Sequence, residues 1–210
     1  MLNLWHAIKA GYLRLIEPVA EWFIRHRVSP NVITTIGTAC ACLAGVIFAS
    51  GHISLAGWTL GILAFFDVVD GTVARRTGKS TVFGAFYDST LDRLSDGVLF
   101  GGLAFFYASN TRHHSLTMVT IALVGLLATF LTSYTRARAE ALGIGMKGIG
   151  MMERPERIAL LAAPQAFFGL GLDGWILRVV VTVLAVTAAI TFVQRVRHVA
   201  RVTATTSPAA

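Results

Sequence analysis

The sequence predicts an all-α integral membrane protein with six transmembrane helices and an N-terminal interfacial amphipathic helix. Two observations support this fold class. Of the 210 residues, 55% are apolar and only 14% are charged, whereas soluble domains carry about 25% charged residues. The chain also contains six apolar stretches, and about 20 mostly apolar residues suffice for one membrane-spanning helix. The chain has too few charged residues to cover the surface of a soluble globule. We therefore attribute the net charge of +7 to basic residues that flank membrane-spanning helices, and we expect no nucleic-acid partner.

Residues 1–28 form the predicted interfacial segment. Apolar side chains recur there every three or four residues, and most arginines and lysines lie off that stripe. This pattern is typical of a helix lying in the membrane surface. A helix packed on the protein's own cytosolic face explains the same pattern equally well.

The membrane domain is predicted to occupy residues 29–202. Ser29 followed by Pro30 is a helix-start signal for the first span, because a capping residue precedes a proline in the first turn. The fifth apolar stretch is short, so its helix should begin earlier, near Arg154. Residues 203–210 are small and polar, and we expect a disordered tail there. The six predicted spans cover residues 32–50, 55–73, 83–109, 116–134, 158–172 and 175–193.

Arginine and lysine mark one side of the membrane. Both termini are basic, as are the loops between spans two and three and between spans four and five, while the alternate loops are nearly bare of cations. Basic residues are retained in the cytoplasm during insertion. We therefore expect a multi-pass protein of the cell membrane with both termini and the active site on the cytoplasmic side.

Several acidic residues lie within or beside apolar spans, where charge is costly and indicates a functional site. Asp67 and Asp70 are three residues apart on one predicted helix, and Asp88 and Asp92 are four apart on the next, so each pair shares a helix face. Counted from the cytosolic loop, Asp67 and Asp92 both lie roughly 13 Å along their helices. Asp96 lies one turn further and is expected to pair with Arg93 or another polar neighbour.

Four carboxylates at one depth repel each other unless they hold protons or bind cations. Oxygen ligands select Mg²⁺ or Mn²⁺, and four carboxylates suffice for two ions with a shared ligand. Asp67, Asp70, Asp88 and Asp92 are therefore the candidate metal ligands.

Small residues accompany the acids. Gly71, Ala74 and Gly84 allow a ligand to approach the backbone closely, although each glycine taken alone is explained equally well by helix packing. Arg75 lies near enough to the same face to meet a diphosphate or to pair with an acid.

The full stretch resembles the signature of the CDP-alcohol phosphotransferases. It has the form DxxDGxxAR from Asp67 to Arg75 and, after eight residues, GxxxDxxxD from Gly84 to Asp92. The resemblance implies two divalent metals held by the first three acids, with the last acid, Asp92, near the second metal and acting as general base. It further implies a homodimer.

The resemblance also assigns a nucleotide site. Its CDP-binding positions correspond to Gly71, Ala74, Arg75 and Gly84, and the segment Pro30-Asn31-Val-Ile-Thr34 is similar to the family's PNxxT motif, so that Asn31 and Thr34 border the nucleotide. The implied donor is a CDP-linked lipid, with CDP-diacylglycerol as our choice. The hydroxyl of a polar acceptor would attack the phosphate that carries the lipid, and CMP would leave.

Arginines near three helix ends indicate the acceptor. Arg136, Arg154 and Arg195 suit a dianionic phosphate, because a guanidinium binds phosphate with two hydrogen bonds. Residues 133–140 and 153–157 resemble the actinobacterial phosphatidylinositol-phosphate synthases, and that resemblance assigns Arg136, Arg154 and Arg195 to the acceptor phosphate, with inositol phosphate or another phosphorylated polyol as the expected acceptor. Ser133 and Arg157 complete the candidate acceptor set, unless Arg157 pairs instead with Glu153 or Glu156. These cations also obey the orientation rule and would contact membrane lipids without any pocket.

Other functions remain as alternatives. The same chemistry with glycerol 3-phosphate would make a phosphatidylglycerophosphate synthase. A membrane prenyltransferase also uses aspartate pairs with Mg²⁺, but the DGxxAR continuation argues against it. An ion or proton transporter would place acids at the membrane midplane within inverted repeats, and a non-catalytic scaffold would leave four facing carboxylates unexplained.

Overall fold

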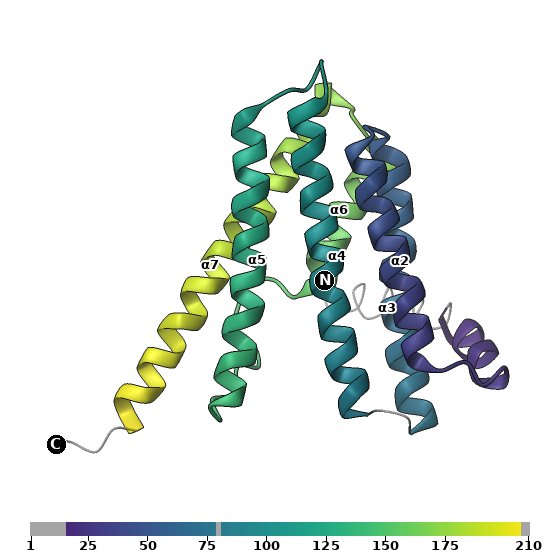
Figure 1. The fold of residues 1–210 in the computed structure, drawn as a ribbon, viewed down its shortest axis with the longest axis vertical. Helices are drawn as coiled ribbons and strands as arrows, with labels where there is room; N and C mark the ends of the chain where they lie inside the picture. Colours follow the sequence, from purple (N-terminus) through teal and green to yellow (C-terminus); the bar gives the residue numbers. More distant parts are fainter. Residues whose placement is uncertain (1–15, 79–80, 207–210) are drawn as a thin grey trace, which may run out of the picture.

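The structure is a computed structural model that describes residues 16–78 and 81–206, and those residues form a bundle of long helices (Figure 1). A helix over residues 16–25 precedes the bundle, and a short 3-10 turn, Leu172–Gly174, precedes the last helix. The bundle helices are α2 Pro30–Ala49, α3 Ile53–Thr77, α4 Val82–Ser109, α5 Leu116–Ala141, α6 Arg154–Phe168 and α7 Trp175–Thr206. All six predicted helices are therefore present, within a few residues of their expected bounds except at the ends of α5, α6 and α7.

Four segments of the described chain are long and apolar enough to span a membrane, which confirms a membrane protein but not six spans. They are Pro30–Ala49, Ile53–Thr77, Leu116–Ala141 and Leu172–Ala204. Helix α4 has 28 residues but carries the acids Asp88, Asp92 and Asp96 together with Arg93. Helix α6 has only 15 residues, or about 22 Å. Helix α4 is therefore not among the four apolar segments because of its charged residues, and helix α6 is not among them because it is short.

Local signals begin these helices where the sequence predicts. The Ser29 side chain accepts a hydrogen bond from the Val32 amide, with Pro30 in the first turn of α2. Helix α6 does begin at Arg154, because Glu153 and Glu156 form a reciprocal capping box at its start. Figure 1 shows that α6 starts partway up the bundle and not at its lower end, and Arg154 at its start reaches Asp67 of α3 and Asp92 of α4.

The six helices close into a ring. Helix α3 packs on α2, α2 on α4, α4 on α5, α5 on α7, α7 on α6, and α6 back on α3. Among the described residues, α3 and α4 make no direct helix contact, because α2 lies between them. The acids of α3 and α4 therefore meet across the interior of the ring, where α6 reaches them.

The contact between α2 and α4 depends on two glycines. A Cβ atom added to Gly102 would overlap the carbonyl oxygen of Gly45. Such backbone overlap has no rotamer solution, so the two helices would have to separate. This close approach sets the position of α4, which carries half of the candidate acids.

We predict that Gly102→Ala lowers the thermal stability of the purified protein, although alanine favours a helix by about 1 kcal/mol. Overpacking of this kind costs about 1–3 kcal/mol. Gly101→Ala is the matched control, because its Cβ would meet nothing within 4 Å, and it should melt at or above the wild-type temperature. A Gly102→Ala protein that melts like Gly101→Ala would contradict the close contact.

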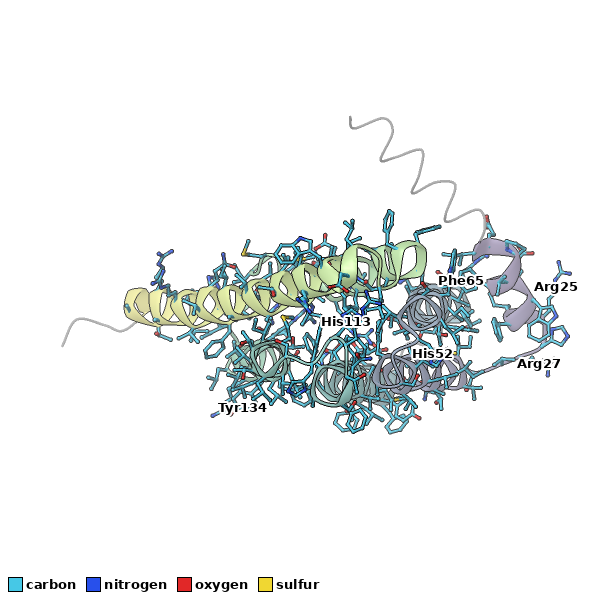
Figure 2. The ribbon with its side chains drawn as sticks, turned by 90° about the horizontal axis from the view of Figure 1, so that it is seen from above. Arg25, Arg27, His52, Phe65, His113 and Tyr134 are labelled. Carbon is cyan, nitrogen blue, oxygen red and sulfur yellow. The ribbon has the colours of Figure 1, made fainter. Side chains whose placement is uncertain are left out.

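The helix over residues 16–25 packs on the side of α3. Its Ile16 and Ala20 are buried with Val69 and Val73, and Arg76 forms ion pairs of 3.6 Å and 3.9 Å with Glu17 and Glu21. In Figure 2, Arg25 and Arg27 point away from the bundle, whereas Phe65 lies on the side of α3 near this helix. These contacts agree with the alternative of packing on the protein itself, while residues 1–15 lie outside the described part.

One end of the bundle is rich in arginine and lysine, and the other end has few of these cations. The end of α3, the start of α4 and the ends of α5 and α7 lie at the lower end in Figure 1, and the α2–α3, α4–α5 and α6–α7 connections lie at the upper end. Helix α7 continues to Thr206, so the prediction of a disordered tail from residue 203 was wrong for residues 203–206. The backbone continues the helix there without a break, and residues 207–210 lie outside the described part.

Candidate active site

The four candidate metal ligands come from two helices. Asp67 and Asp70 lie on α3, and Asp88 and Asp92 lie on α4. The four carboxylates lie close enough to repel one another. Asp67 and Asp88 both repel the negative charge of Asp70 and that of Asp92. Asp70 is buried and Asp88 is exposed. The array thus extends from the interior of the ring toward its lower end.

Asp70 is held from α2. The Thr34 hydroxyl donates a hydrogen bond of 2.7 Å to Asp70 Oδ2, and Thr34 is itself buried. This bond fixes the orientation of the carboxylate. Thr34, predicted beside the nucleotide, thereby contacts the candidate metal site as well.

The predicted nucleotide residues gather at the lower ends of three helices. A Cβ atom added to Gly84 on α4 would lie 3.3 Å from Asn31 Oδ1 on α2. On α3, a Cβ atom added to Gly71 would lie 3.3 Å from Nη1 of Arg75, and Ala74 is half-buried beside that arginine. Side chains larger than hydrogen would therefore crowd polar atoms at both glycines, which agrees with a ligand-binding surface.

Arg154, the first residue of α6, connects the acids of α3 and α4. Its Nη1 atom lies 2.5 Å from Asp67 Oδ2 and 2.8 Å from Asp92 Oδ1. All three side chains are largely buried, with exposed fractions of 14% for Arg154, 25% for Asp67 and 18% for Asp92. One guanidinium thus neutralises an acid from each side of the ring.

Asp96 lies beside this bridge among three arginines. Arg93 Nε, Arg154 Nε and Arg157 Nη2 each lie 3.9 Å from one of its oxygens. The expectation that Asp96 pairs with Arg93 is confirmed, and two further cations from α6 join it. Arg157 also donates a 3.1 Å hydrogen bond to Thr129 Oγ1.

Sequence reasoning missed two members of this group, Arg93 as part of a cationic cluster and Thr129 as a partner of Arg157. A signal existed for Arg93, which lies between Asp92 and Asp96 at a depth where the orientation rule explains no cation. Thr129 carries no comparable signal, since hydroxyl residues are common in membrane helices.

The remaining predicted acceptor residues are less closely joined to this cluster. Arg195 on α7 donates to the carbonyl oxygens of Thr132 at 2.5 Å and Ile149 at 3.0 Å, and the charges of Arg93, Arg136 and Arg157 act on it. Arg136 is exposed and forms a 2.9 Å ion pair with Glu140. The Ser133 hydroxyl donates to the Thr129 carbonyl. Backbone contacts thus hold Arg195 in place, while Arg136 points to the surface.

The donor set fits hard divalent cations by its chemistry, since all four candidate ligands are carboxylates from two facing helices. The carboxylates nevertheless lie apart: within residues 16–78 and 81–206, no three His, Cys, Asp or Glu side chains form a compact ligand group. Two of them, Asp67 and Asp92, are bridged by Arg154.

Comparison with known sequences connects this site to enzymes. A sequence model of the CDP-alcohol phosphatidyltransferase family matches residues 27–193. A phosphatidylinositol phosphate synthase of Streptomyces avermitilis is 35% identical over 207 residues, with 96% of this chain and 83% of that protein covered. The enzyme of the same name from Mycolicibacterium smegmatis is 37% identical over 210 residues, with 95% and 90% covered.

Solved structures give the same result. The crystal structure of Mycobacterium tuberculosis phosphatidylinositol phosphate synthase with CDP-DAG bound superposes with a TM-score of 0.79 at 33% identity, covering 89% of this chain and 94% of that one. The same enzyme in complex with manganese and citrate gives a TM-score of 0.81 at 32% identity, covering 93% of each chain. The family match spans most of the chain and contains all four aspartates, so this protein belongs to the CDP-alcohol phosphatidyltransferase family.

Proposed function

We propose that this protein is a phosphatidylinositol-phosphate synthase, which transfers the phosphatidyl group of CDP-diacylglycerol to a hydroxyl of inositol phosphate and releases CMP. The observation that carries the proposal is the meeting of the aspartate array with Arg154 and Arg157 at the start of α6. Acids that suit metal and diphosphate thereby lie beside cations that suit a phosphorylated acceptor. Its relatives with that enzyme name cover nearly the whole chain.

Two divalent cations, Mg²⁺ or Mn²⁺, are part of the proposal. Asp67, Asp70 and Asp88 would hold them, with Asp92 near the second. When bound, such ions neutralise the diphosphate and stabilise the charge that develops on the leaving group. The manganese complex of the structural relative supports a divalent metal in this family.

Asp92 is the proposed general base. It would accept the proton of the acceptor hydroxyl, whose oxygen forms a new bond to the phosphorus that carries the lipid. The bond from that phosphorus to the bridging oxygen of CMP breaks, and CMP leaves with the electron pair. Because a carboxylate is a weak base, positioning of the hydroxyl must supply much of the effect.

The donor and acceptor occupy different sides of this base. Asn31, Thr34, Gly71, Ala74, Arg75 and Gly84 would bind the CDP part at the lower ends of α2, α3 and α4. Ser133, Arg136, Arg154, Arg157 and Arg195 would form the acceptor-phosphate side, and Arg93 joins them because it shares Asp96 with both α6 arginines.

The membrane arrangement follows from the bundle. We propose that α4 and α6 also lie within the bilayer, which makes six membrane-embedded helices over residues 29–202 with the basic end in the cytoplasm. Asp92 of α4 and Arg154 of α6 are largely buried, and there they neutralise one another. The segment 1–28 would lie at the cytoplasmic interface in contact with membrane lipids, and the enzyme would be a homodimer, as the family resemblance implies.

An acceptor panel tests this function. The purified protein, reconstituted with CDP-diacylglycerol and Mg²⁺, is expected to release CMP with inositol phosphate and not with free inositol or serine. Release with glycerol 3-phosphate alone would make it a phosphatidylglycerophosphate synthase. Release with none of the four would contradict transfer to a polar alcohol.

We predict that Arg195→Ala raises the acceptor KM about tenfold or more, because a hydrogen bond between charged groups contributes about 1.5–3 kcal/mol. Donor affinity should change less, since Arg195 contacts α5 and the 142–153 segment and not the α2–α4 ends. Steady-state kinetics with each substrate varied in turn separates the two. Arg197→Ala replaces an exposed arginine two residues away and is the control. If Arg195→Ala raised the donor KM more than the acceptor KM, Arg195 would belong to the donor site.

A further inference from the structure

We propose that Arg154 is an exchangeable counter-cation. Without a divalent metal it bridges Asp67 and Asp92. When a divalent ion is bound by these acids, Arg154 would leave them, and its guanidinium would bind the acceptor phosphate. This inference rests on the metal and phosphate roles proposed above, and it adds that binding of the two ligands is coupled through one side chain.

The first support is that Arg154 and a metal need the same oxygens. Its Nη1 atom lies within 2.8 Å of both Asp67 Oδ2 and Asp92 Oδ1. A divalent ion held by either oxygen would lie against the guanidinium, and two cations a few ångströms apart in a largely buried site repel strongly. Metal and Arg154 therefore compete for these two acids.

The second support is that the pairing of Arg154 is incomplete. A guanidinium binds best when two of its nitrogens donate in parallel to one carboxylate or phosphate. Here one nitrogen makes both short contacts, and the buried Nε atom has no hydrogen-bond partner among the described residues. Asp96, the next acid, lies 3.9 Å from that Nε, beyond hydrogen-bonding distance. A phosphate can satisfy donors that the bridge leaves unused.

The third support is the place of Arg154 in the fold. It is the first residue of α6, and the capping box of Glu153 and Glu156 anchors the backbone there. The side chain can exchange partners while the helix remains fixed. Arg157, one turn further on, already lies beside Asp96, so a second cation is available on the same helix for the acceptor phosphate.

Coupling between two ligands is reciprocal by thermodynamic necessity. A phosphate that draws Arg154 away from Asp67 and Asp92 must increase metal affinity, and metal must increase phosphate affinity by the same factor. Couplings between sites in proteins are commonly about 5- to 150-fold, which sets the range we expect.

The test measures metal binding without any lipid donor, so its outcome does not depend on catalytic activity. Free Mn²⁺ is quantified by electron paramagnetic resonance during titration of the full chain in detergent. For the wild type, saturating inositol phosphate should lower the Mn²⁺ Kd by about 5- to 150-fold. Free inositol, which lacks the phosphate, should not change it.

Three substitutions identify the residue responsible. Arg154→Gln should lower the Mn²⁺ Kd in the absence of phosphate and abolish the effect of inositol phosphate. Arg154→Lys retains the positive charge and should keep a Kd near that of the wild type. Arg157→Gln is the matched control, because Arg157 is equally buried with 14% exposed but contacts Asp96 instead of Asp67 or Asp92. It should change the phosphate-free Kd less than Arg154→Gln does.

The proposal is overturned if Arg154→Gln binds Mn²⁺ no more tightly than Arg154→Lys, or if Arg157→Gln tightens metal binding as much as Arg154→Gln does. Thermal melting of each variant verifies folding before titration. If the acceptor panel fails while Arg154→Gln still tightens Mn²⁺ binding, the proposed enzyme function is wrong and the counter-cation role of Arg154 stands.

Discussion

Asp92→Asn is expected to lower the rate of CMP release by about 10²- to 10⁴-fold, the usual contribution of a general base. The amide retains the size of the carboxylate and its ability to accept a hydrogen bond from Arg154, which lies 2.8 Å away. It loses the ability to take a proton from the acceptor hydroxyl. Donor binding should persist, because the proposed CDP-binding residues lie at the lower ends of α2, α3 and α4. Rapid quench measurement of CMP and equilibrium binding of CDP-diacylglycerol report the two effects separately.

The control for this prediction is the same chemical change at the other end of the bundle. Asp173 is exposed and pairs with Arg112 at 3.1 Å, far along the chain from the acids of α3 and α4. Asp173→Asn should keep wild-type turnover. An Asp92→Asn enzyme that retains more than a tenth of wild-type turnover would exclude Asp92 as the base.

Chelation of divalent metal is expected to reduce CMP release to background, and added Mg²⁺ or Mn²⁺ should restore it. Without the ions, among the described residues only arginine balances these acids, which we propose to face the diphosphate of the donor, so donor and acids would repel. Comparing the two metals at equal free concentration establishes which one supports faster turnover. Undiminished activity after exhaustive chelation would remove metal ions from the proposed reaction.

The chelated protein should remain folded, and this distinguishes loss of metal from loss of structure. Arg154 neutralises Asp67 and Asp92 from within the protein, so the ring does not depend on metal to hold α3, α4 and α6 together. Its melting transition should persist in the chelator. Loss of the transition together with activity would show that the ions are structural.

The sequence predicted much of this because its strongest signals are local. Helix bounds follow from apolar runs and capping residues, as Ser29 and Pro30 at α2 illustrate. The acid pairs follow from helical spacing alone, since three or four residues separate Asp67 from Asp70 and Asp88 from Asp92. Because the apolar chain has few charged residues, an acid within a predicted span indicated a functional site.

Other features could not be predicted from the sequence, because they depend on contacts between segments that are distant along the chain. The acids of α3 and α4 were expected to lie at one depth, but their spacing does not show that α2 packs between the two helices and that they meet across the ring. Arg93 was expected only to neutralise Asp96, yet it belongs to a cluster with Arg154 and Arg157. Neither the ring order nor the depth at which α6 begins is encoded in any local spacing.

Sequence analysis alone predicted an all-helical membrane chain, one end rich in cations and one end poor in them, and the aspartates of the family signature. These depend on composition and on spacing along one helix. Which cation meets which acid became visible in the folded bundle, because Arg154 and Asp67 are 87 residues apart. Their contact exists because the capping box starts α6 partway along the bundle, at the level of the acids, and electrostatic attraction in a largely buried site then favours pairing with the nearest carboxylates.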